Sequence, residues 1–321
     1  MPSTSALDIQ GHRGARGLMP ENTLPAFARA LTIGVTTLEL DCAITRDGVV
    51  VVSHDSTLNP DITRDMVGEN AGRWITRADL EVSQFTFAEL QSFDVGRIDP
   101  TSDYAARFPR QQAIDGTRMP KLDDVFALAQ KAGNHSVRFN IETKISPLYP
   151  ERTATPEEFA TTVIKVIKNN DLEHRTVVQS LDWRTLAVVQ REAPEIKTAY
   201  LTAQQPFMDN ICAEARTSPW NAGLHVSQFG GSVGNPVPRM IHAAGGAIWS
   251  PCSNDVDAAC VQEAQALGLQ VVVWTVNTEC EMRRMLALGV DGIISDYPDV
   301  LRCVAGENGY RLLTPTPVAA P

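Results

Sequence analysis

The chain has 321 residues, of which 43% are hydrophobic and 21% charged, and its formal net charge is −10 with a pI near 5.1. This length and composition suit one large α/β domain with a substantial core. The acidic balance argues against nucleic-acid binding, which requires a positive surface, and against association with anionic membranes. No run approaches the ~18 consecutive apolar residues of a membrane helix, so we expect no stable membrane association. Residues 1–10 lack a basic start and an apolar stretch, so we expect a cytoplasmic location, or a periplasmic or secreted one if the numbering starts after processing.

Short runs rich in β-branched residues alternate with stretches of helical periodicity along most of the chain. They predict eight strands, at residues 8–11, 37–43, 137–141, 176–179, 198–201, 246–249, 270–274 and 292–295. Helical periodicity follows at 157–169, 183–192, 257–267 and 279–288. This alternation is typical of parallel βα units. The count of eight, together with the length, favours a closed TIM (β/α)8 barrel over an open doubly wound sheet.

Several segments interrupt this alternation. Residues 56–117 are polar and turn-rich over far more than the ~4 to 6 residues of an ordinary connection, which predicts a small insertion, either a lid or a decoration. Residues 223–227 are a ninth candidate strand, and the Gly/Pro-rich residues 229–238 predict an irregular excursion. We therefore expect one domain over residues 1–310 and a disordered tail over residues 311–321.

Six cysteines are scattered through the chain without a Cys-x-x-Cys pair. A chain of this size needs no disulfide staples, so we expect mostly reduced core thiols. Cys252 and Cys260 are the exception, because they flank the polar residues 253–257 and could close a short loop.

Acidic side chains share a face in two of the predicted strands. Glu39 and Asp41 are two residues apart in one strand, and Glu142 and Lys144 have the same spacing at the end of another. Side chains two residues apart in a strand point the same way. Neighbouring carboxylates repel one another unless a cation or a shared proton relieves them. The three carboxylates therefore predict a site for one divalent cation, Ca²⁺ or Mg²⁺, since both prefer oxygen ligands.

Cationic residues follow the strands that carry these carboxylates. His12 and Arg13 come directly after the first strand, His54 follows residues 49–53, and Lys144 lies two residues beyond Glu142. A phosphodiester needs its anionic oxygens neutralised and its leaving oxygen protonated. Arg and Lys can do the first, and a His can do the second. This combination predicts a phosphate-directed site.

A glycosidase-type acid pair is the alternative interpretation of the same carboxylates. Glu39 or Asp41 could act with Glu142 as acid and base. The cationic residues around them suit a phosphate better than a sugar ring.

The motifs of the chain resemble those of the glycerophosphodiester phosphodiesterase family in order and spacing. They are Gly-His-Arg-Gly at 11–14, Pro-Glu-Asn-Thr at 20–23, Glu-Leu-Asp at 39–41, Asp-Gly-Val at 47–49 and His-Asp at 54–55. Later blocks at 119–122, 141–144, 178–180, 274–277 and 291–298 are also similar. The resemblance spans about residues 8–303, and the combination is specific although each short motif alone is weak.

The resemblance implies a barrel enzyme that cleaves small-molecule glycerophosphodiesters to sn-glycerol 3-phosphate and an alcohol. It implies that the metal is held by Glu39, Asp41 and Glu142, that the acid–base pair is His12 and His54, and that substrate is bound by Arg13, Lys144 and Trp274. Trp274 would pack against the glycerol, with filling of the barrel as its alternative role. We expect Asn22 to cap the helix at 24–33. The nucleophile is either water or the substrate's own glycerol 2-hydroxyl.

Two other functions remain open for a barrel with these motifs. Cleavage of lipid-like diesters, of the lysophospholipase D or sphingomyelinase D type, is the nearest alternative, and the polar insertion argues against it because interface-active enzymes expose apolar patches. A non-catalytic phosphodiester sensor is the third interpretation. The intact set of motif residues argues against a sensor.

Overall fold

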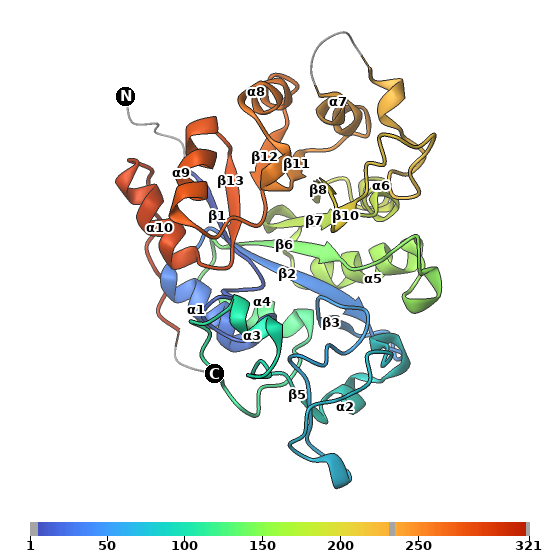
Figure 1. Ribbon diagram of the computed structural model, residues 1–321, viewed down its shortest axis with the longest axis vertical. Helices are drawn as coiled ribbons and strands as arrows, with labels where there is room; N and C mark the ends of the chain where they lie inside the picture. Colours follow the sequence, from blue (N-terminus) through green and yellow to red (C-terminus); the bar gives the residue numbers. More distant parts are fainter. Residues whose placement is uncertain (1–5, 231–234, 319–321) are drawn as a thin grey trace.

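The computed structural model describes residues 6–230 and 235–318, and its centre is a closed barrel of eight parallel strands (Figure 1). The strands are β1 (Asp8–Gly11), β2 (Thr37–Ile44), β6 (Arg138–Thr143), β7 (Thr176–Ser180), β8 (Lys197–Thr202), β11 (Ile248–Pro251), β12 (Gln270–Val273) and β13 (Gly292–Ser295). The barrel closes because β1 pairs with both β2 and β13. The eight predicted strands and the TIM barrel are confirmed.

Within the described residues, eight helices cover the outside of the barrel. They are α1 (Leu24–Ile33), α4 (Leu122–Lys131), α5 (Pro156–Asn169), α6 (Trp183–Glu192), α7 (Pro236–Ala243), α8 (Ala258–Ala266), α9 (Glu279–Leu288) and α10 (Pro298–Glu307). Their apolar faces pack against the strands in one continuous core. Capping boxes begin several of them, such as Thr155 with Glu158 at α5 and Thr278 with Glu281 at α9, and satisfy backbone N–H groups that the helix leaves unpaired.

The predicted insertion is a small unit with its own apolar cluster. It follows β3 (Val50–Val52), which pairs antiparallel with β2, and contains β4 (Arg64–Asp65), β5 (Phe93–Asp94), α2 (Phe87–Leu90) and α3 (Asp103–Arg107). Leu58, Leu90 and Phe93 are buried in the cluster. Figure 1 shows α2 and β5 beside β3, outside the ring of helices. The segment is therefore packed against the barrel rather than a loose connection.

Two local predictions are wrong. Residues 223–227 do not form a ninth strand; they lead into a short 3₁₀ turn, η5 (Val226–Gln228), whose first backbone groups are capped by His225. Asn22 does not cap α1, because Thr23 occupies that position and accepts a hydrogen bond from the Ala26 amide. Asn22 instead adopts a left-handed backbone, with φ of 57°, and turns its side chain toward the barrel.

The segment expected to be a disordered tail contacts the barrel over its described part. The Thr316 amide donates to the Leu31 carbonyl at 3.0 Å, and Arg302 donates to the Leu313 carbonyl at 2.7 Å. Residues 311–318 are therefore held against α1 and α10, while residues 319–321 lie outside the described residues. Within the predicted irregular excursion of residues 229–238, α7 begins at Pro236. Residues 231–234 of this segment also lie outside the described residues.

All six cysteines lie within the described residues and are free thiols. Cys252 and Cys260 are not bonded to each other; the Cys260 thiol instead donates to the Asp257 carbonyl at the start of α8. Among the described residues, none of the helices is long and apolar enough to cross a membrane.

Candidate active site

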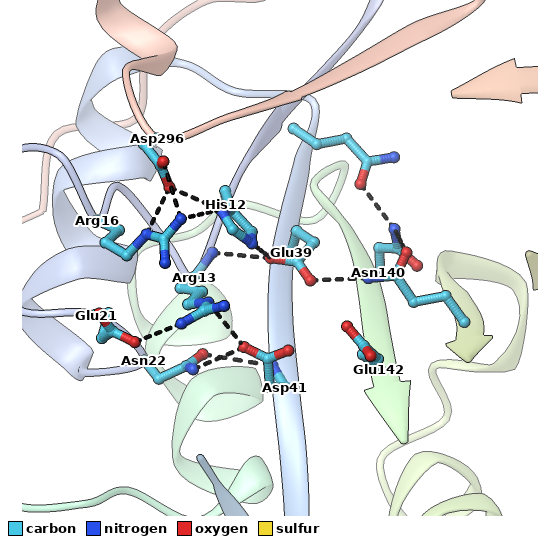
Figure 2. Close-up of polar contacts among 12 residues, drawn as sticks. His12, Arg13, Arg16, Glu21, Asn22, Glu39, Asp41, Asn140, Glu142 and Asp296 are labelled. Carbon is cyan, nitrogen blue, oxygen red and sulfur yellow. Dashed lines mark hydrogen bonds and ion pairs between the residues drawn. The ribbon is translucent and has the colours of Figure 1, made fainter. Parts of the chain in front are cut away.

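Three acidic side chains from β2 and β6 converge inside the barrel. The strands pair in parallel with Asp41 opposite Glu142, and the side chains of Glu39, Asp41 and Glu142 are buried. One carboxylate oxygen from each lies within 4.8 Å of the others. Figure 2 shows the three carboxylates directed into one space between the two strands. The pairs predicted from strand alternation are therefore brought together by the register of β2 with β6.

The oxygens of this cluster are unequally satisfied. Glu39 accepts a hydrogen bond from the Arg13 amide and one from Gln179 Nε2, both at 2.8 Å. Asp41 Oδ2 accepts from Asn22 Nδ2 at 2.9 Å. Asp41 Oδ1 is buried and has no hydrogen-bond partner among the described residues. A buried carboxylate oxygen without a donor is costly, so this oxygen is suited to a cation.

Burial and mutual repulsion control the charges of the cluster. Burial, reinforced by Asp41, raises the pKa of Glu39 well above its usual range. Burial also raises the pKa of Glu142 to about 7, although Lys144 acts in the opposite direction. The pKa of Asp41 is lowered because Arg13 and other nearby cations outweigh its burial. Hard oxygen donors that repel one another fit a divalent cation, which would relieve the repulsion.

Arg13 and Lys144 flank the carboxylates on opposite sides. Arg13 Nη1 donates to Glu21 Oε1 at 2.6 Å, and its Nε lies 3.2 Å from Asp41 Oδ2. Lys144 Nζ donates to Glu142 Oε1 at 2.8 Å. Both cations lie beside carboxylates, which raise the pKa of each against the effect of desolvation. They keep positive charge next to the cluster, as binding of a phosphate requires.

His12 is held by residues from the other end of the chain. Its Nδ1 lies 2.6 Å from Asp296 Oδ1, and its Nε2 lies 3.9 Å from Glu39 Oε2. Asp296 also accepts from Arg16 Nε at 2.7 Å and from Asn277 Nδ2 at 2.7 Å. Burial lowers the pKa of His12 to about 4, with Asp296 opposing and Arg16 reinforcing the effect. The imidazole is thus fixed with Nε2 directed toward the carboxylates.

His54 has a similar arrangement on the other side of the cluster. Its Nδ1 lies 2.7 Å from Asp55 Oδ1. Burial lowers the pKa of His54, and Arg13 and Lys144 add to this effect. An aspartate at Nδ1 sets the tautomer and leaves Nε2 for another partner. The two predicted histidines therefore share one geometry.

Sequence reasoning did not assign several residues that support the site. Arg16, Asn277 and Asp296 hold His12, and Asp296 follows β13 at the carboxyl end of the barrel, a position that could have identified it. Tyr104 of the insertion donates to Glu21 Oε2 and accepts from Arg16 Nη1. Nothing in the local sequence around Tyr104 links it to residues so far away in the chain.

A chain of amides forms the floor below the carboxylates. Asn140 Nδ2 donates to Gln10 Oε1 and to Gln179 Oε1, both at 2.8 Å. Gln179 Nε2 in turn donates to Glu39 Oε1. These bonds span four strands of the barrel interior and fix the orientation of the Glu39 carboxylate.

The cluster opens into a cavity of about 580 Å³, large enough for a small-molecule ligand. Seven of the eight predicted site residues line it: His12, Arg13, Glu39, His54, Glu142, Lys144 and Trp274. Asp41 is not among the lining residues and is fully buried. Trp274 follows β12 and donates from Nε1 to the Ser250 carbonyl at 2.8 Å, which exposes one part of the indole to the cavity.

The chain is similar to a known family and to characterised proteins over almost its whole length. The Glycerophosphoryl diester phosphodiesterase family matches residues 12–300. A glycerophosphodiester phosphodiesterase of Caldanaerobacter subterraneus is 29% identical over 94% of this chain and 98% of its own length. A human lysophospholipase D is 26% identical over 91% of this chain and 83% of its own length.

Solved structures share the barrel over almost its full length. A Silicibacter pomeroyi protein, provisionally named a glycerophosphoryl diester phosphodiesterase, is 35% identical with a TM-score of 0.83, covering 96% of each chain. An Oleispira antarctica phosphodiesterase, solved with the product sn-glycerol-3-phosphate, is 21% identical with a TM-score of 0.64, covering 94% of this chain and 97% of its own.

Proposed function

Because the chain belongs to the glycerophosphoryl diester phosphodiesterase family, we propose that it hydrolyses glycerophosphodiesters to sn-glycerol 3-phosphate and an alcohol with the help of a divalent cation. The observation that carries this proposal is the buried cluster of Glu39, Asp41 and Glu142, with cationic side chains on both sides. Such a site can bind a cation and a phosphodiester side by side. The complex of the Oleispira phosphodiesterase with sn-glycerol-3-phosphate supports the same product.

The three carboxylates would hold the cation, either Ca²⁺ or Mg²⁺. The buried Oδ1 of Asp41 and the short separation of the carboxylate oxygens support this assignment. The cation supplies charge neutralisation at the phosphoryl oxygens. Arg13 and Lys144 would bind the remaining phosphate charge, and Trp274 would contact the glycerol.

We assign acid–base catalysis to His12 and His54. Each imidazole has an aspartate at Nδ1, so the proton at Nδ1 is held and Nε2 is available to the substrate. One histidine would take a proton from the nucleophile, and the other would give a proton to the departing alcohol oxygen. The nucleophile is either water or the glycerol 2-hydroxyl. Accumulation of a cyclic phosphate in His12→Ala or His54→Ala would favour the hydroxyl, whereas direct entry of solvent oxygen would favour water.

Cleavage of lipid-like diesters is the second candidate function. Leu181, Leu201, Phe207 and Met208 form an apolar wall of the cavity, and the Phe207 side chain is 70% exposed at its edge. A lysophospholipid could place its acyl chain against this wall. Faster turnover of lysophosphatidylcholine than of glycerophosphocholine would favour this candidate.

The experiment that tests the proposed function follows release of glycerol 3-phosphate from a panel of glycerophosphodiesters. The purified protein is first treated with a chelator, and Ca²⁺ or Mg²⁺ is then added back separately. We expect chelation to abolish release and one of the two cations to restore it. Absence of release from every member of the panel, with cation present, would refute the proposal.

A further inference from the structure

One basic side chain that lines the cavity differs from the others in its partners. The cavity is lined by six cationic or titratable basic side chains, namely His12, Arg13, Arg16, His54, Lys144 and Arg107. The first five each lie within 4.0 Å of a carboxylate. Arg107 has no carboxylate partner within that distance among residues 6–230 and 235–318. Its positive charge is therefore the one left uncompensated at the wall of the cavity.

Arg107 is the last residue of α3, and the two aromatic residues beside it both contact residues of the site. Its guanidinium carbon lies 5.3 Å from the ring centre of Tyr104 and 5.6 Å from that of Phe108. Tyr104 is bonded to Glu21, while the buried Phe108 ring lies 4.6 Å from the guanidinium carbon of Arg16. Cation–π contacts with two fixed rings restrict the arginine, so less freedom is lost when it binds a ligand.

The place of Arg107 separates it from the reacting phosphate. Arg13 is buried and Lys144 half-buried next to the carboxylate cluster, whereas Arg107 is exposed on the insertion, at the outer part of the cavity. Glu281, a carboxylate that also lines the cavity, is engaged in capping α9 through Thr278. An anionic group of a ligand at the outer wall could thus bind Arg107 without competition from a carboxylate of the protein.

We infer that Arg107 is a specificity-determining residue that binds a second anionic group, a phosphate or carboxylate, on the alcohol part of the substrate. This inference rests on the proposed function, in which the glycerol and the reacting phosphate occupy the inner part of the cavity. A guanidinium binds such groups through two parallel hydrogen bonds. The insertion would therefore select among glycerophosphodiesters by the charge of their alcohol.

The test compares substrates whose alcohol parts differ in charge. The probes are glycerophosphoinositol and its ring-phosphorylated form, with glycerophosphocholine as a cationic alcohol. We expect the wild type to prefer the phosphorylated form, and Arg107→Ala to lower kcat/KM for that form by about tenfold, as expected for loss of a charge-assisted hydrogen-bonding partner. The same variant should leave kcat/KM for glycerophosphoinositol within about twofold, which is too small a change for loss of such a partner. Arg107→Lys should restore part of the preference, because the charge remains but the planar fork is lost.

Arg110→Ala is the matched control. Arg110 is three residues further along, is exposed and pairs with Asp299, and it does not line the cavity. Its removal changes the net charge equally, so it should leave the substrate preference of the wild type unchanged. An equal loss of kcat/KM on all probes in Arg107→Ala would overturn the inference while leaving the proposed function intact. An equal change of substrate preference in Arg107→Ala and Arg110→Ala would do the same. Failure of the wild type to cleave any probe would instead refute the proposed function.

Discussion

Replacement of Glu142 by glutamine tests the cation site through protein stability, without reference to turnover. Glu142 contributes one of the three clustered carboxylates, and its contact with Lys144 is the hydrogen bond at 2.8 Å. Glutamine has the same shape but no charge. It therefore weakens cation binding while leaving the packing of β6 unchanged.

The expected size follows from the linkage between binding and unfolding. A ligand present at 100 times its Kd stabilises the folded state by about 2.7 kcal/mol. For a chain of this length, roughly 2 °C of Tm corresponds to 1 kcal/mol, so the bound cation should raise the Tm of the wild type by about 5 °C. If the lost carboxylate weakens binding by about 100-fold, the same cation concentration leaves only about 0.4 kcal/mol, or less than about 1 °C.

The assay is thermal unfolding of each protein with chelator and with added Ca²⁺ or Mg²⁺. Glu281→Gln is the control, because Glu281 lines the same cavity but caps α9, a role that glutamine can also perform. We expect Glu281→Gln to keep the cation-induced rise. An equal rise in Glu142→Gln and wild type would refute the assignment of Glu142 as a ligand, and absence of a rise in the wild type with either cation would refute the site.

Four further substitutions probe the groups around the cluster. His12→Ala and His54→Ala should each lower kcat by about 10²- to 10⁴-fold while the cation-induced rise in Tm is retained; a wild-type rate in steady-state assays would remove that histidine from acid–base catalysis. Asp296→Asn should destabilise the protein at neutral pH. The pKa of Asp296 lies below its usual range, because Arg16 and His12 outweigh its burial. The stabilisation that the carboxylate contributes is therefore present above about pH 4 and is lost as the pH falls below that value. In urea unfolding at several pH values, the difference in unfolding free energy between wild type and variant should therefore become smaller on acidification. A difference that grows on acidification would contradict this reasoning. Tyr104→Phe removes the donor to Glu21 and should cost about 1–3 kcal/mol in urea unfolding; an unchanged free energy of unfolding would show that this bond does not tie the insertion to the barrel.

Local patterns were sufficient to predict the elements of the barrel and part of its site. The eight strands were recognisable because strands buried on both faces are short apolar runs between helical stretches. Glu39 and Asp41 could be placed on one face because side-chain alternation depends only on spacing within a strand. His12 and His54 were not distinguished by any such pattern, and came from the resemblance of their motifs to a known family.

Other expectations failed where local propensity competed with contacts made elsewhere. Residues 223–227 have a strand-like composition, yet they pair with no strand of the barrel and lead into η5, which the His225 side chain caps. Asn22 is a residue type favoured at helix starts, but Asp41 lies near enough to take its side-chain hydrogen bond. The tail is rich in Pro, Thr and Ala, and its backbone nevertheless donates a hydrogen bond to the Leu31 carbonyl.

The sequence by itself determined the strand and helix pattern, the pairing of carboxylates on shared faces and the identity of the motifs, because each depends on residues close together in the chain. Only the tertiary structure decided which distant groups complete the site. Closure of the barrel sets Gly11 opposite Ser295, and this register brings Asp296 to His12. Packing of the insertion likewise brings Tyr104 to Glu21 and Arg107 to the cavity wall. No local pattern encodes these contacts, since they arise from the path of the whole chain around the barrel.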